Sequence, residues 1–194
     1  TSASTSVFDP RNRVKSTTDR NTGTTTFTYD ANNNNLTITD ADANAGGTNK
    51  QTVYTYDSRN LKLTEQYPDH APGSVPGQVG YDIVTHAYDG AHRPRSKADQ
   101  KGETITYTHD MASRLTTRSY LTLGNDTFTY DKASRLLTAV SARYQNTATF
   151  TYDQAGRTAT ESLTTFNQTY TLNRTYNARN ELTQITYPDG AIVN

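Results

Sequence analysis

Residues 127–136 read Thr-Phe-Thr-Tyr-Asp-Lys-Ala-Ser-Arg-Leu, which predicts the end of one strand, a tight turn and the start of the next strand. Phe128 and Tyr130 are two positions apart, so both rings lie on one face of an extended chain. Asp131 favours a turn because its carboxylate can accept backbone N–H bonds two residues further on. Ser134 is another turn-forming residue, and Leu136 restarts the apolar pattern.

The same pattern recurs along the chain roughly every twenty to thirty residues, which is the signature of a repeat protein. Four positions after each aromatic anchor stands a residue that tolerates left-handed backbone, such as Ser134 or Gly156, and Arg follows it in five copies. These arginines are Arg13, Arg93, Arg114, Arg135 and Arg157. The eight anchor pairs are Phe8-Asp9, Tyr29-Asp30, Tyr56-Asp57, Tyr88-Asp89, His109-Asp110, Tyr130-Asp131, Tyr152-Asp153 and Tyr176-Asn177.

A second set of turn signals lies between the anchors, so each repeat is predicted to hold two strands. These signals are Asn21-Thr22-Gly23, Ala45-Gly46-Gly47, Lys101-Gly102, Gly124-Asn125-Asp126 and Pro188-Asp189-Gly190. The expected fold is all-β, an antiparallel meander of roughly sixteen strands, and such long sheets twist, curl or close. The long spacers Asp40–Gln51 and Tyr67–Gly80 are expected to be loops on one rim. Residues 1–194 therefore form a single repeat array in this prediction.

Composition supports a sheet with a thin core. Only 32% of the residues are hydrophobic, there are 14 Tyr and no Trp, and the mean hydropathy is −0.86. The formal net charge is zero without a basic run, so nothing in the sequence predicts a nucleic-acid partner or an anionic membrane surface. No stretch approaches the roughly 20 apolar residues of a membrane span. The absence of Cys excludes disulfides and thiol chemistry.

The pattern Tyr-Asp-x-x-(Gly/Asn/Ser)-Arg-Leu-Thr resembles the YD repeat of the Rhs family. This family includes Rhs and wall-associated polymorphic toxins, the C subunits of insecticidal toxin complexes, and the teneurins. The best matches are residues 130–138, 152–157 and 176–190, and the resemblance covers nearly the whole chain. It implies a curled strip that spirals into a hollow β-shell, with neighbouring repeats and an enclosed toxin or other polypeptide as partners.

The aspartates could be pictured as paired carboxylates for acid–base catalysis. Their regularity favours a structural role in turns instead, because catalysis needs one special constellation of groups. The rings could form a stacking surface for sugars or unfolded polypeptide, but packing across strands is the simpler interpretation. Each arginine is expected to bridge to the aspartate of a neighbouring repeat or to be solvated. We therefore expect no enzyme activity and no catalytic residue.

No cofactor or metal site is expected either. Residues 40–44, Asp-Ala-Asp-Ala-Asn, have the spacing of a calcium loop, but Ala45 stands where Gly is required and Gln51 where Glu is required. His70, His86, His92 and His109 lack zinc-ligand spacing, and ring packing explains His86 and His109. The asparagines of the four Asn-x-Ser/Thr sequons matter only in a secreted eukaryotic protein; they are Asn35, Asn125, Asn167 and Asn173.

The predicted function follows from shape: a structural segment in the wall of a shell, either an excised piece of a longer chain or a unit that assembles through open β-edges. The self-cleaving Asp-Pro motif expected at the end of complete Rhs cores does not match Asp9-Pro10, which is followed by Arg11. One alternative is an extracellular adhesion or carbohydrate-binding module with a glycan ligand. Another is a filament or coat subunit. We expect a secreted or cell-surface location, although the sequence shows no signal peptide.

Overall fold

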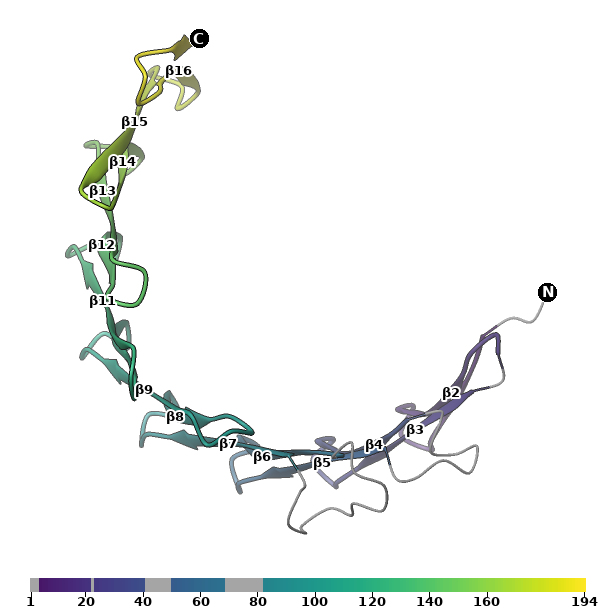
Figure 1. Cartoon of the computed structure of the whole chain (residues 1–194). Coiled ribbons are helices and arrows are strands. Elements are labelled where there is room, and N and C mark those ends of the chain that lie inside the picture. The colour runs from purple at the N-terminus through teal and green to yellow at the C-terminus, as the bar shows by residue number, and fades with distance from the viewer. Residues whose placement is uncertain (1–3, 22, 41–49, 69–81) are drawn as a thin grey trace. The chain divides into compact units, whose positions relative to one another are not determined.

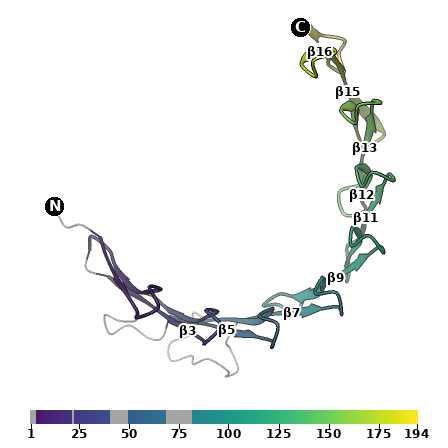
Figure 2. The same cartoon turned by 180° about the vertical axis from the view of Figure 1, so that it is seen from behind.

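The structure is a computed structural model that describes residues 4–21, 23–40, 50–68 and 82–194. These ranges contain seventeen β-strands, and every regular element in them is a strand. The chain divides into two compact units, residues 1–104 and 105–194 (Figure 1; Figure 2 gives the view from behind). Within the described ranges, no helix is present that could span a membrane.

Unit 1 contains eight strands, each hydrogen-bonded antiparallel to the next one in the chain. The strands are β1 (Thr5–Phe8), β2 (Val14–Thr18), β3 (Thr24–Tyr29), β4 (Asn35–Thr39), β5 (Gln51–Tyr56), β6 (Lys62–Tyr67), β7 (Asp82–Tyr88) and β8 (Pro94–Ala98).

Unit 2 begins within β9 and continues the same pattern of antiparallel neighbours. Its strands are β9 (Thr104–His109), β10 (Leu115–Tyr120), β11 (Gly124–Tyr130), β12 (Leu136–Ser141), β13 (Asn146–Tyr152), β14 (Thr158–Thr165), β15 (Gln168–Tyr176), β16 (Leu182–Thr186) and β17 (Ile192–Val193). The all-β antiparallel meander predicted from the sequence is confirmed.

The two faces of the sheet carry different chemistry because directly paired residues share a face. In unit 2, Phe128 pairs with Ala139 on what we call the aromatic face, and Thr129 pairs with Thr138 on the threonine face. The two hydroxyl oxygens of Thr129 and Thr138 are 2.6 Å apart and form a hydrogen bond. Equivalent hydroxyl pairs join Thr28 to Thr37, Thr55 to Thr64, Thr151 to Thr160, and Ser162 to Thr171.

The core is as thin as the composition suggests. Among the apolar residues that the structure describes, Val84 alone is buried. The rings of Phe128, Tyr130 and Tyr152 are half-buried, because a single sheet covers each ring on one side only. The aromatic residues therefore pack against neighbouring strands without being enclosed.

Some of the predicted turns are confirmed and one is wrong. Lys101-Gly102 and Pro188-Asp189-Gly190 lie in turns, whereas Ala45-Gly46-Gly47 lies outside the described residues. Gly124-Asn125-Asp126 is not a turn but the start of β11, and the turn precedes it at residues 121–123. Glycine is needed at position 124 for a reason other than a turn. Its φ is +78° inside the strand, and an added Cβ would lie 2.8 Å from the Cβ of Ala142.

Candidate functional site: aspartate turns and arginine clasps

The turn at Asp131 shows how each repeat connects its two strands. Asp131 Oδ1 accepts hydrogen bonds from the backbone N–H of Ala133 at 2.8 Å and of Arg135 at 2.9 Å. The backbone N–H of Asp131 donates to the carbonyl of Arg135 at 3.0 Å. Ser134 has φ = 64°, the left-handed conformation that small polar residues tolerate. The carboxylate thus satisfies backbone donors that the turn would otherwise leave unpaired.

The structure repeats this geometry at all eight anchor pairs. In each one the backbone N–H of the aspartate, or of Asn177 in the last, donates to the carbonyl four residues later. The position before that carbonyl always has positive φ; these residues are Asn12, Asn33, Asn60, His92, Ser113, Ser134, Gly156 and Asn180. The same strand pairs also contain a register shift at the anchor aromatic or its partner, where one extra residue forms a β-bulge.

The arginine after each left-handed residue binds the aspartate of its own turn. Arg135 donates from Nε to Asp131 Oδ2 at 2.6 Å, and its Nη2 lies 2.6 Å from the same oxygen. Arg13, Arg93, Arg114 and Arg157 pair in the same way with Asp9, Asp89, Asp110 and Asp153. The sequence predicts a bridge to the aspartate of a neighbouring repeat or a solvated arginine, whereas the carboxylate that each arginine binds is that of its own turn. The aspartate and the arginine are four residues apart in the same turn, and this spacing brings their charged groups together.

The same guanidinium also reaches the next repeat. Arg114 Nη1 donates to the backbone carbonyl of Asp131 at 2.9 Å, and its Cζ lies 4.9 Å from the ring centroid of Tyr130. Arg13 makes the corresponding contacts with Asp30 and Tyr29, and Arg157 makes them with Asn177 and Tyr176. We call this arrangement the arginine clasp. Each clasp ties one turn to the next through a charged hydrogen bond and a cation–π contact.

The anchor tyrosine adds a third link between successive repeats. Tyr130 donates its hydroxyl hydrogen to the backbone carbonyl of Leu115, the first residue of the second strand of the preceding repeat, at 2.9 Å. Tyr29, Tyr56, Tyr88, Tyr152 and Tyr176 donate in the same way to Val14, Asn35, Lys62, Leu136 and Thr158. The tyrosine therefore fixes its ring on the aromatic face and holds the preceding repeat at the same time.

The electrostatics of the turn keep the aspartates ionised. The hydrogen bond from the backbone N–H of Arg135 lowers the pKa of Asp131, and the Arg135 side chain lowers it further. For Asp110 and Asp153 the hydrogen bond from the arginine side chain is the largest cause of a lowered pKa. A carboxylate with a lowered pKa and several donors bound to it is a weak base. This favours a structural role over proton transfer.

Two turns in unit 1 depart from the clasp. In the first, Asn34 takes the arginine position and donates to Asp30 Oδ2 and to Asn60 Oδ1 of the next turn, both at 2.8 Å. In the second, Leu61 takes that position, and Arg59 binds Asp57 instead. Across this joint, Glu65 of β6 forms a 3.0 Å hydrogen bond with Nε2 of His86 in β7 and accepts a 2.5 Å hydrogen bond from the Tyr67 hydroxyl. That hydrogen bond raises the pKa of Tyr67 to about 12. His86 was expected from the sequence to pack like a ring, and its bond to Glu65 was missed.

A buried carboxylate in unit 2 was also missed, because it lies inside the predicted turn at residues 124–126. Asp126 is only 4% exposed. Its Oδ2 accepts two hydrogen bonds from Arg118, at 2.6 and 3.0 Å, and one from the Tyr120 hydroxyl at 3.1 Å. Burial raises the pKa of Asp126, but hydrogen bonds from Ser141, Arg118 and Tyr120 outweigh it, so the pKa is lowered.

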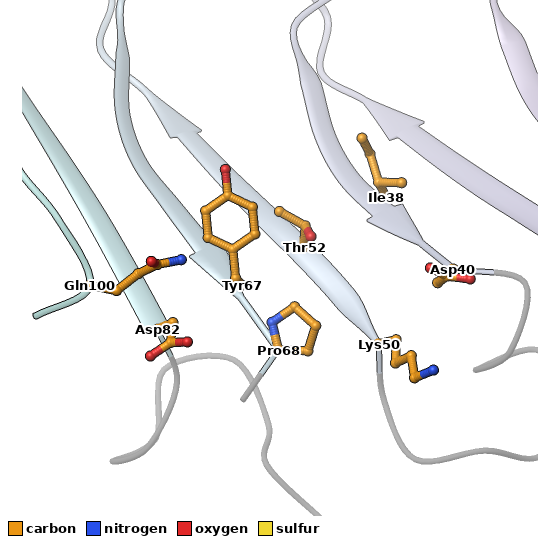
Figure 3. Close-up of a pocket in the computed structure, with 8 residues that line it drawn as sticks. All are labelled: Ile38, Asp40, Lys50, Thr52, Tyr67, Pro68, Asp82 and Gln100. Atoms are coloured by element: carbon orange, nitrogen blue, oxygen red, sulfur yellow. The ribbon is translucent and has the colours of Figure 1, made fainter. Parts of the chain in front are cut away.

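A hollow of about 370 Å³ lies on the aromatic face of unit 1 (Figure 3). Ile38, Thr52, Tyr67 and Pro68 line part of it. Its polar lining comes from Asp40, Lys50, Asp82 and Gln100. Among the described residues, no group of three or more His, Asp or Glu side chains is placed to hold a metal ion. Most of the candidate calcium loop, from Ala41 to Asn44, and His70 lie outside the described residues.

Comparison with known proteins identifies the repeat that the sequence resembles. The family model described as RHS Repeat matches residues 8–45 and 88–126. No curated protein sequence matches the chain. Among solved structures, the crystal structure of TcdB2-TccC3-TEV is similar over 95% of this chain, with a TM-score of 0.57 and 13% identity. A structure of the Photorhabdus luminescens Tc holotoxin pore is similar over 97% of this chain, with a TM-score of 0.61 and 12% identity.

These structural likenesses concern the fold. The chain spans 11% of the TcdB2-TccC3-TEV chain and 13% of the holotoxin chain, so it corresponds to a small part of each. The fold, the eight anchor turns and the two family matches agree with one another. The resemblance to the YD repeat is confirmed: two segments of the chain match the RHS Repeat family model, and the fold is similar to that of TccC3-containing structures.

Proposed function

We propose that this chain is a structural segment in the wall of a hollow Rhs-type β-shell that encloses a toxin or other polypeptide. The segment has no catalytic role of its own. The observation that carries the proposal is the arginine clasp. The repeats of a wall must hold to one another, and three clasps bind an aspartate turn to the backbone of the following turn. A ligand site would need only one such constellation.

The rest of the proposal follows from the repeat chemistry. Residues 1–194 belong to one array of about eight repeats, part of a longer chain that curls into the shell. The eight anchor pairs act as structural hinges between strands. The carboxylates of their aspartates are occupied by backbone donors and by arginine or asparagine side chains, as at Asp131 and Asp30. The fold likeness to TccC3-containing complexes supports a toxin-associated role. We place the shell outside the cell or on its surface, without cofactors.

Protease protection of the full-length gene product tests this function. If the wall encloses a polypeptide, that polypeptide resists added protease in the native protein and is cut after denaturation. The clasp variant Arg114→Ala/Arg157→Ala should speed the cutting of the enclosed polypeptide. Arg179→Ala, which removes an exposed arginine from the last aspartate turn, is the matched control and should leave protection unchanged. A product whose interior segments are cut as fast as in the denatured protein would refute the proposal.

Carbohydrate binding is a second candidate, favoured by the hollow on the aromatic face. Its volume suits a small ligand, and a tyrosine ring beside carboxylate, amide and ammonium groups is a combination that binds sugars through ring stacking and hydroxyl hydrogen bonds. The hydrogen bond from Tyr67 to Glu65 holds the ring in place. A glycan array with the native chain and with Tyr67→Ala tests it. A hit that Tyr67→Ala abolishes supports this candidate, and no hit removes it.

A further inference from the structure

The threonine face of β10 and β11 does little to define how these two strands pair. Thr117 is directly opposite Thr127, and Ser119 is directly opposite Asn125. If β11 shifted by two residues, Thr117 would lie opposite Asn125 or Thr129, and every side chain would keep its face because strands alternate with a period of two. Small polar residues would still meet small polar residues, so this face does not select the native register.

The connection between β10 and β11 is a weak guide to the register as well. Residues 121–123 are Leu-Thr-Leu, which have no turn preference. Gly124 follows with φ = +78°, but glycine adopts positive and negative φ with similar ease, so it permits the native turn without selecting it. The turns after β2 and β8 differ, because the carboxylates of Asp19 and Asp99 each close them by accepting two backbone hydrogen bonds.

Asp126 on the aromatic face has partners that depend on the register of three strands. Arg118 of β10 is directly opposite it, and the guanidinium donates to Asp126 Oδ2 at 2.6 and 3.0 Å. The Tyr120 hydroxyl donates to the same oxygen at 3.1 Å. On the other side, Ser141 of β12 is directly opposite Asp126. A shift of β10 or β12 by two residues would move Arg118 or Ser141 to a diagonal position.

Burial makes the loss of these partners costly. Asp126 is only 4% exposed, so water cannot replace a donor that a shifted strand removes, and an unsatisfied buried carboxylate is strongly unfavourable. We propose that Asp126 is a register lock, a buried carboxylate that selects one pairing of β10, β11 and β12 among those that the threonine pattern allows. A buried polar residue selects the register of a coiled coil in the same way. The lock does not depend on the proposed shell.

Two other joints between repeats also carry an ion pair or a charged hydrogen bond on the aromatic face. Arg174 of β15 donates to Glu161 of β14 at 2.8 Å, and His86 of β7 lies 3.0 Å from Glu65 of β6. Their connections are also poor guides to register, since one places a bulky residue at φ = 47° and the other is long. Within residues 136–152, no ion pair crosses the joint between β12 and β13, so the fold itself does not require one.

Pairs of introduced cysteines report the register, because the chain contains no natural cysteine. Thr117→Cys/Thr127→Cys reports the native register, and Thr117→Cys/Asn125→Cys and Thr117→Cys/Thr129→Cys report the two shifted ones. Only directly opposite residues are close enough for a disulfide. Each 194-residue protein is refolded from urea under reducing conditions and then oxidised briefly with copper phenanthroline. The native pair should cross-link at least about tenfold more than either shifted pair.

The variant Arg118→Met/Asp126→Leu removes the lock and keeps similar side-chain volumes. Replacing a buried ion pair with apolar residues often leaves stability unchanged or raises it, so the urea midpoint should not fall. The excess of native over shifted cross-links should nevertheless drop to about threefold or less. A pair that only stabilised the sheet would do the reverse. Thr151→Cys/Thr160→Cys, in the hairpin that Asp153 closes, is the control and should cross-link equally in both proteins.

Each outcome decides the matter. If the apolar variant keeps the native excess, the Gly124 turn or another contact sets the register and the inference is wrong. It is also wrong if shifted cross-links are as abundant as native ones when Asp126 is present. If the apolar variant loses the control cross-link and so does not fold, Asp126→Asn decides, because it keeps the shape and removes the charge. The native excess should then fall at least about threefold, and an unchanged excess would overturn the inference.

Discussion

Arg13 donates a 2.9 Å hydrogen bond from its side chain to the backbone carbonyl oxygen of Asp30, the first residue of the next aspartate turn. This single contact shows how the array keeps its order despite a thin core. Short-range hydrogen bonds shape each turn, and in the turns of Arg13, Arg114 and Arg157 the arginine also donates to the backbone of the following turn. Polar contacts between successive turns therefore stabilise the array along one rim of the sheet.

Replacing a clasp arginine by lysine is expected to weaken the array although the charge is kept. Arg114→Lys loses the two-pronged contact with Asp110, the hydrogen bond to the Asp131 carbonyl and the stacking on Tyr130. We expect a loss of about 1 kcal/mol, because each of these contacts is partly exposed. Urea unfolding of the two proteins measures it. Equal midpoints would show that the clasp contributes nothing.

The anchor tyrosine offers a matched pair of variants. Tyr130→Phe keeps the ring but removes the hydroxyl that donates to the Leu115 carbonyl, so stability should fall by about 1 kcal/mol. Tyr144→Phe removes a hydroxyl from a ring that is 61% exposed and should have no measurable effect. Thermal unfolding of both variants decides the point. A Tyr130→Phe protein as stable as the native chain would contradict the role given to this hydroxyl.

Acid should destabilise the sheet. The turn aspartates have lower pKa values folded than unfolded, where an aspartate has a pKa of about 3.9. The folded protein therefore binds fewer protons in this range, and their stabilisation is fully present above pH 4 and lost as the pH falls through the lowered values. Urea midpoints measured between pH 7 and about pH 2 should fall below pH 4. The decline should be shallower in Asp131→Asn, and parallel curves would contradict this.

The backbone conformation of Phe166 predicts a substitution that stabilises the isolated chain. Phe166→Asn replaces a bulky residue at φ = 47° with one that tolerates this conformation, so the free energy of unfolding should rise by about 0.5–1 kcal/mol. The control is Phe166→Leu, which stays bulky and should not stabilise. Calorimetry of the 194-residue chain measures both variants. A destabilised Phe166→Asn protein would mean that Phe166 has a local packing role.

Much of the fold could be predicted from residues 127–136. The alternation of Phe128 and Tyr130 with threonines defines a strand, and Asp131 with Ser134 defines the turn, because both signals act within a few residues. Eight phased copies then specify an antiparallel meander without any knowledge of long-range contacts. The left-handed backbone found at Asn12, Ser134 and Gly156 follows from the same reasoning.

The contacts between repeats could not be predicted from the sequence in the same way. The partner of Arg114 across the joint is a backbone carbonyl, which has no signature in the sequence. Gly124 suggested a turn because glycine supplies positive φ both in turns and at irregular strand positions. The Phe166-Asn167 connection was missed because its first residue disfavours the conformation it adopts. Prediction from neighbouring residues failed where residues distant in the chain, or a partner, determine the local conformation or contact.

The most direct test of the account is an electron cryomicroscopy map of the full-length gene product at a resolution that shows the strands. We predict that residues 5–193 form part of a continuous β wall around a cavity, with density for a polypeptide inside it. A map in which this sheet stands open to solvent on both faces, or lies in a filament without a cavity, would contradict the account.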